Sequence, residues 1–206
     1  VARIPEDRHA VGVVGDLPVW ENAVAERLRG LWFAHPWFRA FWVKRTAARQ
    51  HAQRVAETFD VRGGGADAPA RSLSGGNMQK LILGRALLPP PGRGEGGALG
   101  AAASAAAAPV LIVAHQPTWG LDVGAVAAIQ RELLAARDAG SAVLVISDDL
   151  DEVMRLGDRI AVLHAGHLTA ALPAGEWTRE GLGLAMAGAP AEAVWNVQGA
   201  DTEVAP

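Results

Sequence analysis

Hydrophobic and polar positions follow different patterns in the two halves of the chain. Between residues 21 and 60 they favour helix, with the better helical segments at 21–28 and 46–59. Farther on, short continuous apolar runs at 110–114 and 142–146 are typical of buried parallel strands. The pattern therefore predicts a helical first half and a sheet-containing second half.

The remaining elements follow from the same pattern. Helices are expected at 123–137, 150–156 and 178–187, and a short strand is expected around 11–14. The runs 159–163 and 168–172 predict a hairpin whose turn contains Ala165 and Gly166. Strand–helix–strand order in the second half predicts an α/β fold with a parallel sheet.

Two stretches lack any such pattern. Residues 89–109 consist mostly of Pro, Gly and Ala, which predicts a flexible insertion without a fold of its own. The last residues, 189–206, are weakly patterned, and we expect a disordered tail there.

Composition narrows the class of protein. The 206 residues are 50% hydrophobic, which suits one globular domain with a sizeable core. A net charge of −3 gives no case for nucleic acid as a partner. The chain has no cysteine, which fits a reducing compartment, and no apolar stretch of the roughly 20 residues needed to span a bilayer.

The most informative chemistry lies in the run Leu73-Ser74-Gly75-Gly76-Asn77-Met78-Gln79-Lys80. Ser74 can cap the helix that follows, and the two glycines leave the first backbone amides uncovered. A helix N-terminus with bare amides and a hydroxyl can bind phosphate. Taken alone, Ser-Gly-Gly is better explained as an ordinary capped helix after a glycine turn, because capped helix starts are common.

The run resembles the signature motif, LSGG-x-x-Gln, of ABC-type ATPases, and we call residues 74–77 the signature turn. Further motifs of that family occur in the family's order. They are Pro117-Thr118 with Gly120-Leu121-Asp122 after a strand, Val145 to Val153 as the switch region, Asp158 to Leu168 as the "DRI" hairpin, and Ile4 to Arg8 as the Q-loop region. The last is similar to the second half of the tandem ATPases of sugar and nucleoside importers.

The resemblance covers residues 1–188 apart from the insertion. It implies a partial P-loop-type ABC ATPase domain, an α/β parallel sheet with helices plus a helical signature subdomain. On this basis the helical subdomain occupies about 20–88, the insertion 89–109, and the α/β part 110–188.

The resemblance also implies roles for individual residues. Ser74, Gly75 and Gly76 would grip the γ-phosphate of ATP, while Asn77 and Gln79 shape the helix start. Asp122, in the family's D-loop, would couple two ABC halves across their interface.

Several departures from the family pattern point to a degenerate catalytic site. No G-x-x-x-x-G-K-[ST] phosphate loop occurs, so we expect an N-terminally truncated domain. His115 and Gln116 replace the Walker B Asp–Glu pair, Asp148 replaces the switch His, and Glu6 holds the Q-loop position. Imidazole is a poor ligand for Mg²⁺, and an amide cannot take a proton from water. We expect no metal site formed by this chain alone.

The resulting expectation is an ATP-binding component of an ABC importer for simple sugars or nucleosides. ATP and Mg²⁺ would sit at a composite site held mainly by another ABC half, and permease subunits would be further partners. The protein would lie at the cytoplasmic face of the membrane, and alone it would not hydrolyse ATP. The alternatives are a non-catalytic interaction or regulatory module and a non-functional truncated fragment.

Three smaller features leave alternatives open. The aromatic cluster at 32–42 is either local core or a contact with a membrane partner. Trp119 either stacks on adenine or fills an interface. The acidic run 148–152 is best explained as the charged first turn of a helix rather than a metal cluster.

Overall fold

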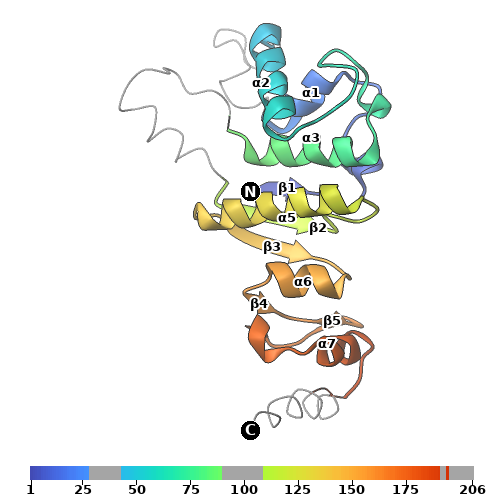
Figure 1. Cartoon of the computed structure of the whole chain (residues 1–206), viewed down its shortest axis with the longest axis vertical. Coiled ribbons are helices and arrows are strands. Elements are labelled where there is room, and N and C mark those ends of the chain that lie inside the picture. The colour runs from blue at the N-terminus through green and yellow to red at the C-terminus, as the bar shows by residue number, and fades with distance from the viewer. Residues whose placement is uncertain (28–42, 90–108, 191–193, 195–206) are drawn as a thin grey trace. The chain divides into compact units, whose positions relative to one another are not determined.

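The computed structural model describes residues 1–27, 43–89, 109–190 and 194 (Figure 1). The aromatic cluster at 32–42 and almost all of the 89–109 insertion therefore lie outside the described residues. The chain forms two compact units, Val1–Leu144 and Val145–Pro206. The division into a helical subdomain, an insertion and an α/β part stays a prediction.

A three-stranded sheet lies in the order β1-β2-β3. Its strands are β1 (Ala2–Ile4), β2 (Leu111–His115) and β3 (Ala142–Ile146). β1 pairs in parallel with β2, with Ala2 opposite Ile112 and Ile4 opposite Ala114. The predicted parallel sheet is confirmed. Its central strand, β2, lies between β1, from the start of the chain, and β3, which begins 27 residues after β2.

Helices complete the first unit. They are α1 (Val19–Val24), α2 (Arg45–Thr58), α3 (Gly75–Leu87) and α5 (Val123–Asp138), with short turns η1 (Arg8–Gly12), η2 (Ala25–Arg27) and η3 (Ala70–Ser72). α1, α2 and α3 pack on one another, and α3 also contacts β1 and α5 (Figure 1). Met78, Leu81 and Ile82 of α3 are at most 1% exposed, so α3 joins the helical layer to the sheet.

Two strand predictions are wrong. Residues 11–14 are not a strand: Arg8–Gly12 form a π-helical turn, because the Asp7 carboxylate caps it by accepting from the His9 and Ala10 amides. β3 has the predicted bounds but is not buried, since Leu144 is 51% exposed. Ala142, Leu144 and Ile146 alternate along β3 and therefore share one face of the strand, and all three are exposed.

The second unit holds two short antiparallel ladders and two helices. Its elements are α6 (Leu150–Leu156), β4 (Arg159–Ile160), β5 (Leu163–His164), β6 (His167–Leu168), β7 (Leu172–Pro173), η4 (Ala174–Glu176) and α7 (Arg179–Met186). β5 pairs with β6 and β4 with β7, so the predicted hairpin is confirmed. Ala165 and Gly166 both have positive φ, as a two-residue hairpin turn requires.

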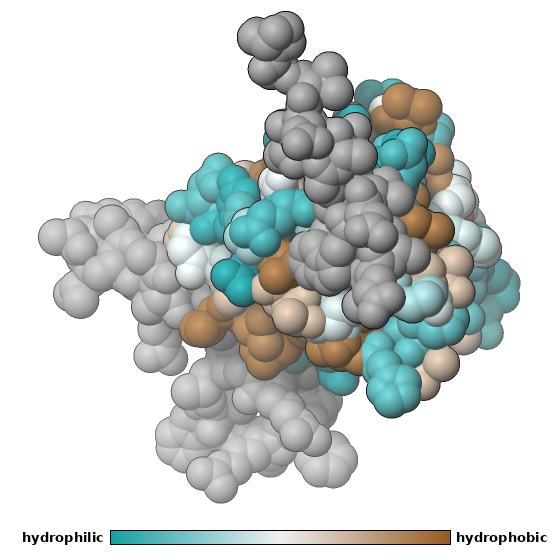
Figure 2. Space-filling view, turned by 90° about the horizontal axis from the view of Figure 1, so that it is seen from below, coloured by the Kyte–Doolittle hydropathy of each residue, from teal (hydrophilic) through white to brown (hydrophobic). Residues whose placement is uncertain are grey.

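The core of the second unit is a cluster around Trp177 and Leu182. The Trp177 indole N–H donates to the Ile160 carbonyl at 3.2 Å, which satisfies the buried polar tip of the ring. Val194 packs in this cluster at 5% exposure, although sequence analysis placed it in a disordered tail. Apolar side chains also gather on the surface seen in Figure 2, and Leu163 and Leu168 are the most exposed large ones of this unit.

Candidate functional site

The signature turn begins α3 with its polar groups arranged for an external acceptor. Ser74 is the N-cap, and its Oγ accepts hydrogen bonds from the Asn77 backbone N–H at 3.4 Å and from Asn77 Nδ2 at 2.9 Å. Asn77 Oδ1 in turn accepts from the Arg62 amide at 2.7 Å, which fixes the Asn77 side chain. Because Ser74 Oγ serves as acceptor in both contacts, its hydroxyl hydrogen is left to donate.

The two glycines add backbone donors beside this hydroxyl. In the described part of the chain, the Gly75 and Gly76 amides donate to no protein atom. They belong to the first turn of a 13-residue helix, where orphan amides and the helix dipole favour an anion. The signature turn therefore presents one hydroxyl and two amides in the arrangement that the sequence predicted.

Asp122 lies close to this turn. It caps α5, with Oδ1 accepting from the Ala125 amide at 3.0 Å. A β-carbon placed on Gly76 would be 3.9 Å from Asp122 Oδ2, so the first turn of α3 and the start of α5 are neighbours. The structure thus brings Asp122 together with the signature turn.

A hollow of about 450 Å³ opens beside the signature turn, between the end of α2 and the starts of α3 and α5. Ser74, Gly76, Asn77 and Asp122 line it. So do Asp60, Arg62, Lys80, Arg131 and Glu132, which make its rim charged.

The cations of this rim are partly neutralised. Lys80 Nζ donates to the Asp60 carbonyl at 3.0 Å and to its carboxylate at 3.2 Å. Arg62 Nε donates to the same carboxylate at 2.9 Å. Hydrogen bonds from Arg62 first and Lys80 second hold the pKa of the Asp60 carboxyl below its ordinary value. Asp60 therefore gathers two basic side chains next to the signature turn.

Gln79 is placed differently from the other signature residues. It is 2% exposed, and its Nε2 donates to the Pro117 carbonyl at 2.9 Å. Its side chain therefore joins α3 to the turn that follows β2, residues 116–122. The role of Gln79 at the ATP site remains a prediction, and the contact observed is a structural one.

The 116–122 turn has a second tether that sequence reasoning missed. Arg8 Nη2 donates to the Trp119 carbonyl at 3.0 Å, across 111 positions of sequence. The turn also contains two left-handed residues, Gln116 at φ 48° and Gly120 at φ 65°. The one available signal for Arg8 was its place two residues after the Q-loop position.

The altered positions Glu6 and His115 meet at the end of β2. Glu6 Oε2 lies 3.4 Å from His115 Nε2, and each side chain is about half exposed. This pair does not fit Mg²⁺, because imidazole is a poor ligand for that ion and Glu6 already faces the ring. No group of three or more metal-ligating side chains occurs in the described ranges.

Asp148 belongs to the second unit and is exposed. Its neighbour Asp149 caps α6 by accepting from the Asp151 and Glu152 amides at 2.9 and 3.3 Å. The acidic run is therefore the charged first turn of a helix, as predicted.

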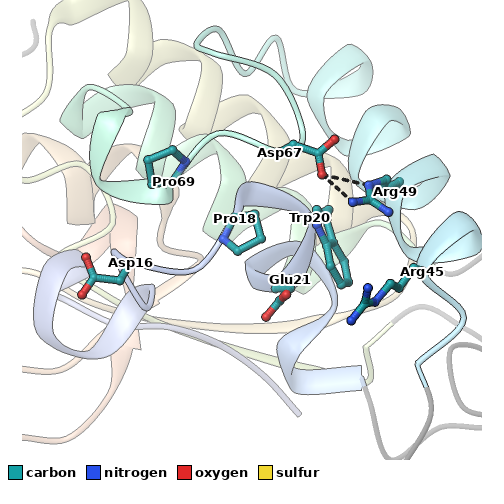
Figure 3. Close-up of a pocket in the computed structure, with 8 residues that line it drawn as sticks. All are labelled: Asp16, Pro18, Trp20, Glu21, Arg45, Arg49, Asp67 and Pro69. Carbon is teal, nitrogen blue, oxygen red and sulfur yellow. Dashed lines mark hydrogen bonds and ion pairs between the residues drawn. The ribbon is translucent and has the colours of Figure 1, made fainter.

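A second, shallower hollow of about 350 Å³ lies between α1, α2 and the loop at 67–69 (Figure 3). Figure 3 shows Arg49 turned toward Asp67, to which it donates two hydrogen bonds at 2.9 and 2.7 Å. The same guanidinium lies 5.1 Å from the centre of the Trp20 ring. The Arg49 side chain is therefore held by Asp67 and Trp20.

No known family profile matches the chain. It is 37% identical over 188 residues to the nucleoside import ATP-binding protein NupA of Lactococcus lactis, covering 91% of this chain and 33% of that protein. It is 36% identical over 188 residues to the guanosine import ATP-binding protein NupO of Bacillus subtilis, covering 91% and 32%.

A third relative is the glucose import ATP-binding protein TsgD13 of Haloferax volcanii, 37% identical over 190 residues, which cover 91% of this chain and 30% of that one. The chain thus spans about a third of the length of the curated relatives it matches. Among solved structures, the dimeric ATP-binding cassette MJ0796 matches with TM-scores of 0.55 and 0.58 at 20% identity, over 84% of this chain and 62% of that one. This likeness shows the α/β fold of an ATP-binding cassette.

Proposed function

We propose that this chain, a homologue of the ATP-binding proteins of ABC importers over nine tenths of its length, contributes the signature side of a composite ATP site. The catalytic parts of that site would lie on another ABC half. The observation that carries the proposal is the signature turn, where Ser74 Oγ accepts from Asn77 and keeps its hydrogen for an external acceptor.

The first turn of α3 supports phosphate as that acceptor. A phosphoryl group brings several oxygens, which suit the Ser74 hydroxyl and the Gly75 and Gly76 amides together. The dipole of a 13-residue helix favours the negative charge. The catalytic contribution would be to stabilise charge on the γ-phosphate of ATP held by the other half.

The residues at the end of β2 support the proposal that this chain's own catalytic positions are degenerate. Glu6 and His115 contact each other at 3.4 Å. Gln116 can orient a water molecule but has no carboxylate to accept its proton. This half would therefore bind nucleotide weakly or structurally at its own altered positions, and ATP with Mg²⁺ would be held mainly by the partner.

The relatives support a proposal for the partners. Their names describe import of nucleosides, guanosine or glucose, so we propose an importer for simple sugars or nucleosides. Permease subunits would carry the solute, with this protein peripheral at the cytoplasmic face of the membrane. None of the helices in the described ranges is long and apolar enough to cross a bilayer.

The decisive experiment assembles the chain with an ABC half that carries an intact G-x-x-x-x-G-K-[ST] loop. We expect Ser74→Arg to lower ATP turnover by about 100-fold or more, because it removes a donor and fills the turn. Ser72→Arg is the matched control: Ser72 is also exposed, but its hydroxyl donates to the Pro69 carbonyl at 2.7 Å.

Two results would contradict the proposal. Unchanged turnover in Ser74→Arg would favour a non-catalytic interaction module that keeps only the dimerising surfaces. Hydrolysis of Mg-ATP by the isolated chain at the rate of the assembled protein would contradict the degenerate site.

A further inference from the structure

We propose that Arg8 is a positioning residue of the composite site, which holds the 116–122 turn, and through it Asp122, against the signature turn. This inference rests on the proposed function for its effect on ATP turnover. The contact itself is a property of this chain alone.

The guanidinium of Arg8 lies between two backbone segments. Its Nη2 donates to the Trp119 carbonyl at 3.0 Å. A β-carbon placed on Gly75 would lie 3.6 Å from Arg8 Cζ, and one placed on Gly120 would lie 3.1 Å from Nη2. Arg8 therefore touches the start of α3 and the 116–122 turn at once.

The backbone around Arg8 is itself fixed. Asp7 caps η1 through the His9 and Ala10 amides at 2.9 and 2.8 Å, and the Val13 amide donates to the Arg8 carbonyl at 3.0 Å. At the other end of η1, a β-carbon on Gly12 would lie 2.5 Å from Ile82 Cδ1, so η1 packs directly on α3. The guanidinium is thus held from a short, anchored turn rather than from a free loop.

Two side chains from outside hold the 116–122 turn. Gln79 donates to the Pro117 carbonyl and Arg8 to the Trp119 carbonyl. Inside the turn, the Trp119 amide donates to the Gln116 carbonyl at 3.2 Å and the Leu121 amide to the Thr118 carbonyl at 3.3 Å, which are long bonds. The side-chain bonds from outside therefore add to the order that the turn's own bonds provide.

The turn leads directly to the groups of the site. Asp122 follows Trp119 by three residues, and its Oδ2 lies 3.9 Å from a β-carbon placed on Gly76. A shift of the Trp119 carbonyl would move Asp122 relative to the first turn of α3. Arg8 thus acts on the site through the backbone of residues 119–122, without contacting ATP.

The choice of arginine follows from the geometry. Its planar guanidinium places one N–H on the Trp119 carbonyl while its face lies against Gly75, and a charged donor gives a stronger hydrogen bond than a neutral one. Glycine at position 120 suits this contact. Its φ of 65° and the 3.1 Å between a placed β-carbon and Arg8 Nη2 both disfavour a side chain there.

The first test measures hydrogen exchange in the chain by itself. We expect Arg8→Gln to accelerate exchange of the Trp119 and Leu121 amides by about tenfold, the size of one lost charge-assisted bond. Arg8→Lys, which keeps a charged donor, should restore part of the protection. Arg71→Gln is the matched control, because Arg71 pairs with Asp16 and has no bond to the turn.

The second test measures ATP turnover after assembly with a half that has an intact phosphate loop. A positioning role predicts that Arg8→Gln lowers kcat by about tenfold with little change in the KM for ATP. Arg71→Gln should leave both unchanged. Unchanged exchange in Arg8→Gln overturns the tether, and faster exchange with unchanged kcat overturns the positioning role.

Failure of the proposed function gives a different pattern. In that case Ser74→Arg and Arg8→Gln would both leave turnover unchanged, while exchange in the 116–122 turn would still respond to Arg8. The two hypotheses are therefore separated by the Ser74 variant.

Discussion

The signature turn and the end of β2 differ in whether their polar groups form hydrogen bonds within the protein. At the signature turn, Ser74 and the amides of Gly75 and Gly76 are left to face outward. At the end of β2, His115 faces Glu6, and the following carbonyls accept from Gln79 and Arg8. The donors of the first region are unused within the described part of the protein, whereas the groups of the second bond to other parts of it.

This difference teaches what each region costs the folded chain. Polar groups are costly when buried without partners, so the carbonyls that follow β2 gain from their internal donors. Outward donors at an exposed helix start carry no such cost, because water satisfies them. The contrast can be tested from either side.

The largest expected effect comes from placing negative charge in the outward-facing region. Gly76→Glu should lower ATP turnover of the assembled protein by about 100-fold or more, because a carboxylate would repel phosphate. The fold should tolerate the change, since a β-carbon there meets its nearest neighbour at 3.8 Å. Steady-state ATP hydrolysis is the measurement.

Gly175→Glu is the control for that variant, because a β-carbon at Gly175 meets nothing within 4 Å and the residue lies in the second unit. Equal turnover in the two variants would contradict a role of the signature turn in ATP turnover.

The next effect concerns the inward-facing region. Gln79→Leu should lower the free energy of unfolding by about 2 kcal/mol, because it leaves the Pro117 carbonyl without its buried donor. Urea unfolding of the isolated chain measures it. Gln53→Leu is the control, since Gln53 Nε2 bonds only the exposed Glu57.

The same experiment tests whether the chain folds by itself. A gradual, non-cooperative urea curve would favour the non-functional fragment named among the alternatives. A cooperative transition with equal midpoints for Gln79→Leu and Gln53→Leu would show that the Pro117 contact is not stabilising.

A smaller effect is expected at Glu6 and His115. His115→Asp restores the family's Walker B residue but sets a carboxylate opposite Glu6. We expect the free energy of unfolding to fall by about 1 kcal/mol, with no ATP hydrolysis by the isolated chain. His167→Asp, at an exposed hairpin position, controls for the added charge. A gain of Mg²⁺-dependent hydrolysis would contradict our account of this region.

The smallest effect is the pH dependence of the charged rim beside the signature turn. The folded protein holds the pKa of Asp60 below 3.8, through Arg62 and Lys80. Its stabilisation is therefore present above pH 3.8 and is lost as the pH falls through the lower folded value. Asp60→Asn should unfold at lower urea than the parent chain at pH 7, and this difference should disappear once the pH lies below the folded pKa. A difference that persists in acid would exclude the carboxylate as its source.

Local sequence was sufficient for most elements of the second half. β3 and α6 have the predicted bounds, and α5 extends the predicted helix by one residue. Helix caps act over a few positions, and Asp122, Asp149 and Thr178 cap helices whose starts the pattern predicted to within one residue. The strand β1 was missed because three residues before a proline give too short a pattern.

What the sequence determined by itself is the chemistry of the signature turn and the order of the motifs, since both depend on residues within a few positions of one another. What only the tertiary structure decided is which of these groups meet. Glu6 contacts His115, Arg8 contacts Trp119, and β3 leaves Leu144 half exposed. The two contacts join residues more than a hundred positions apart, and they follow from parallel pairing of β1 with β2 and from helix packing. The exposure depends on what packs against one face of β3, which no local pattern encodes.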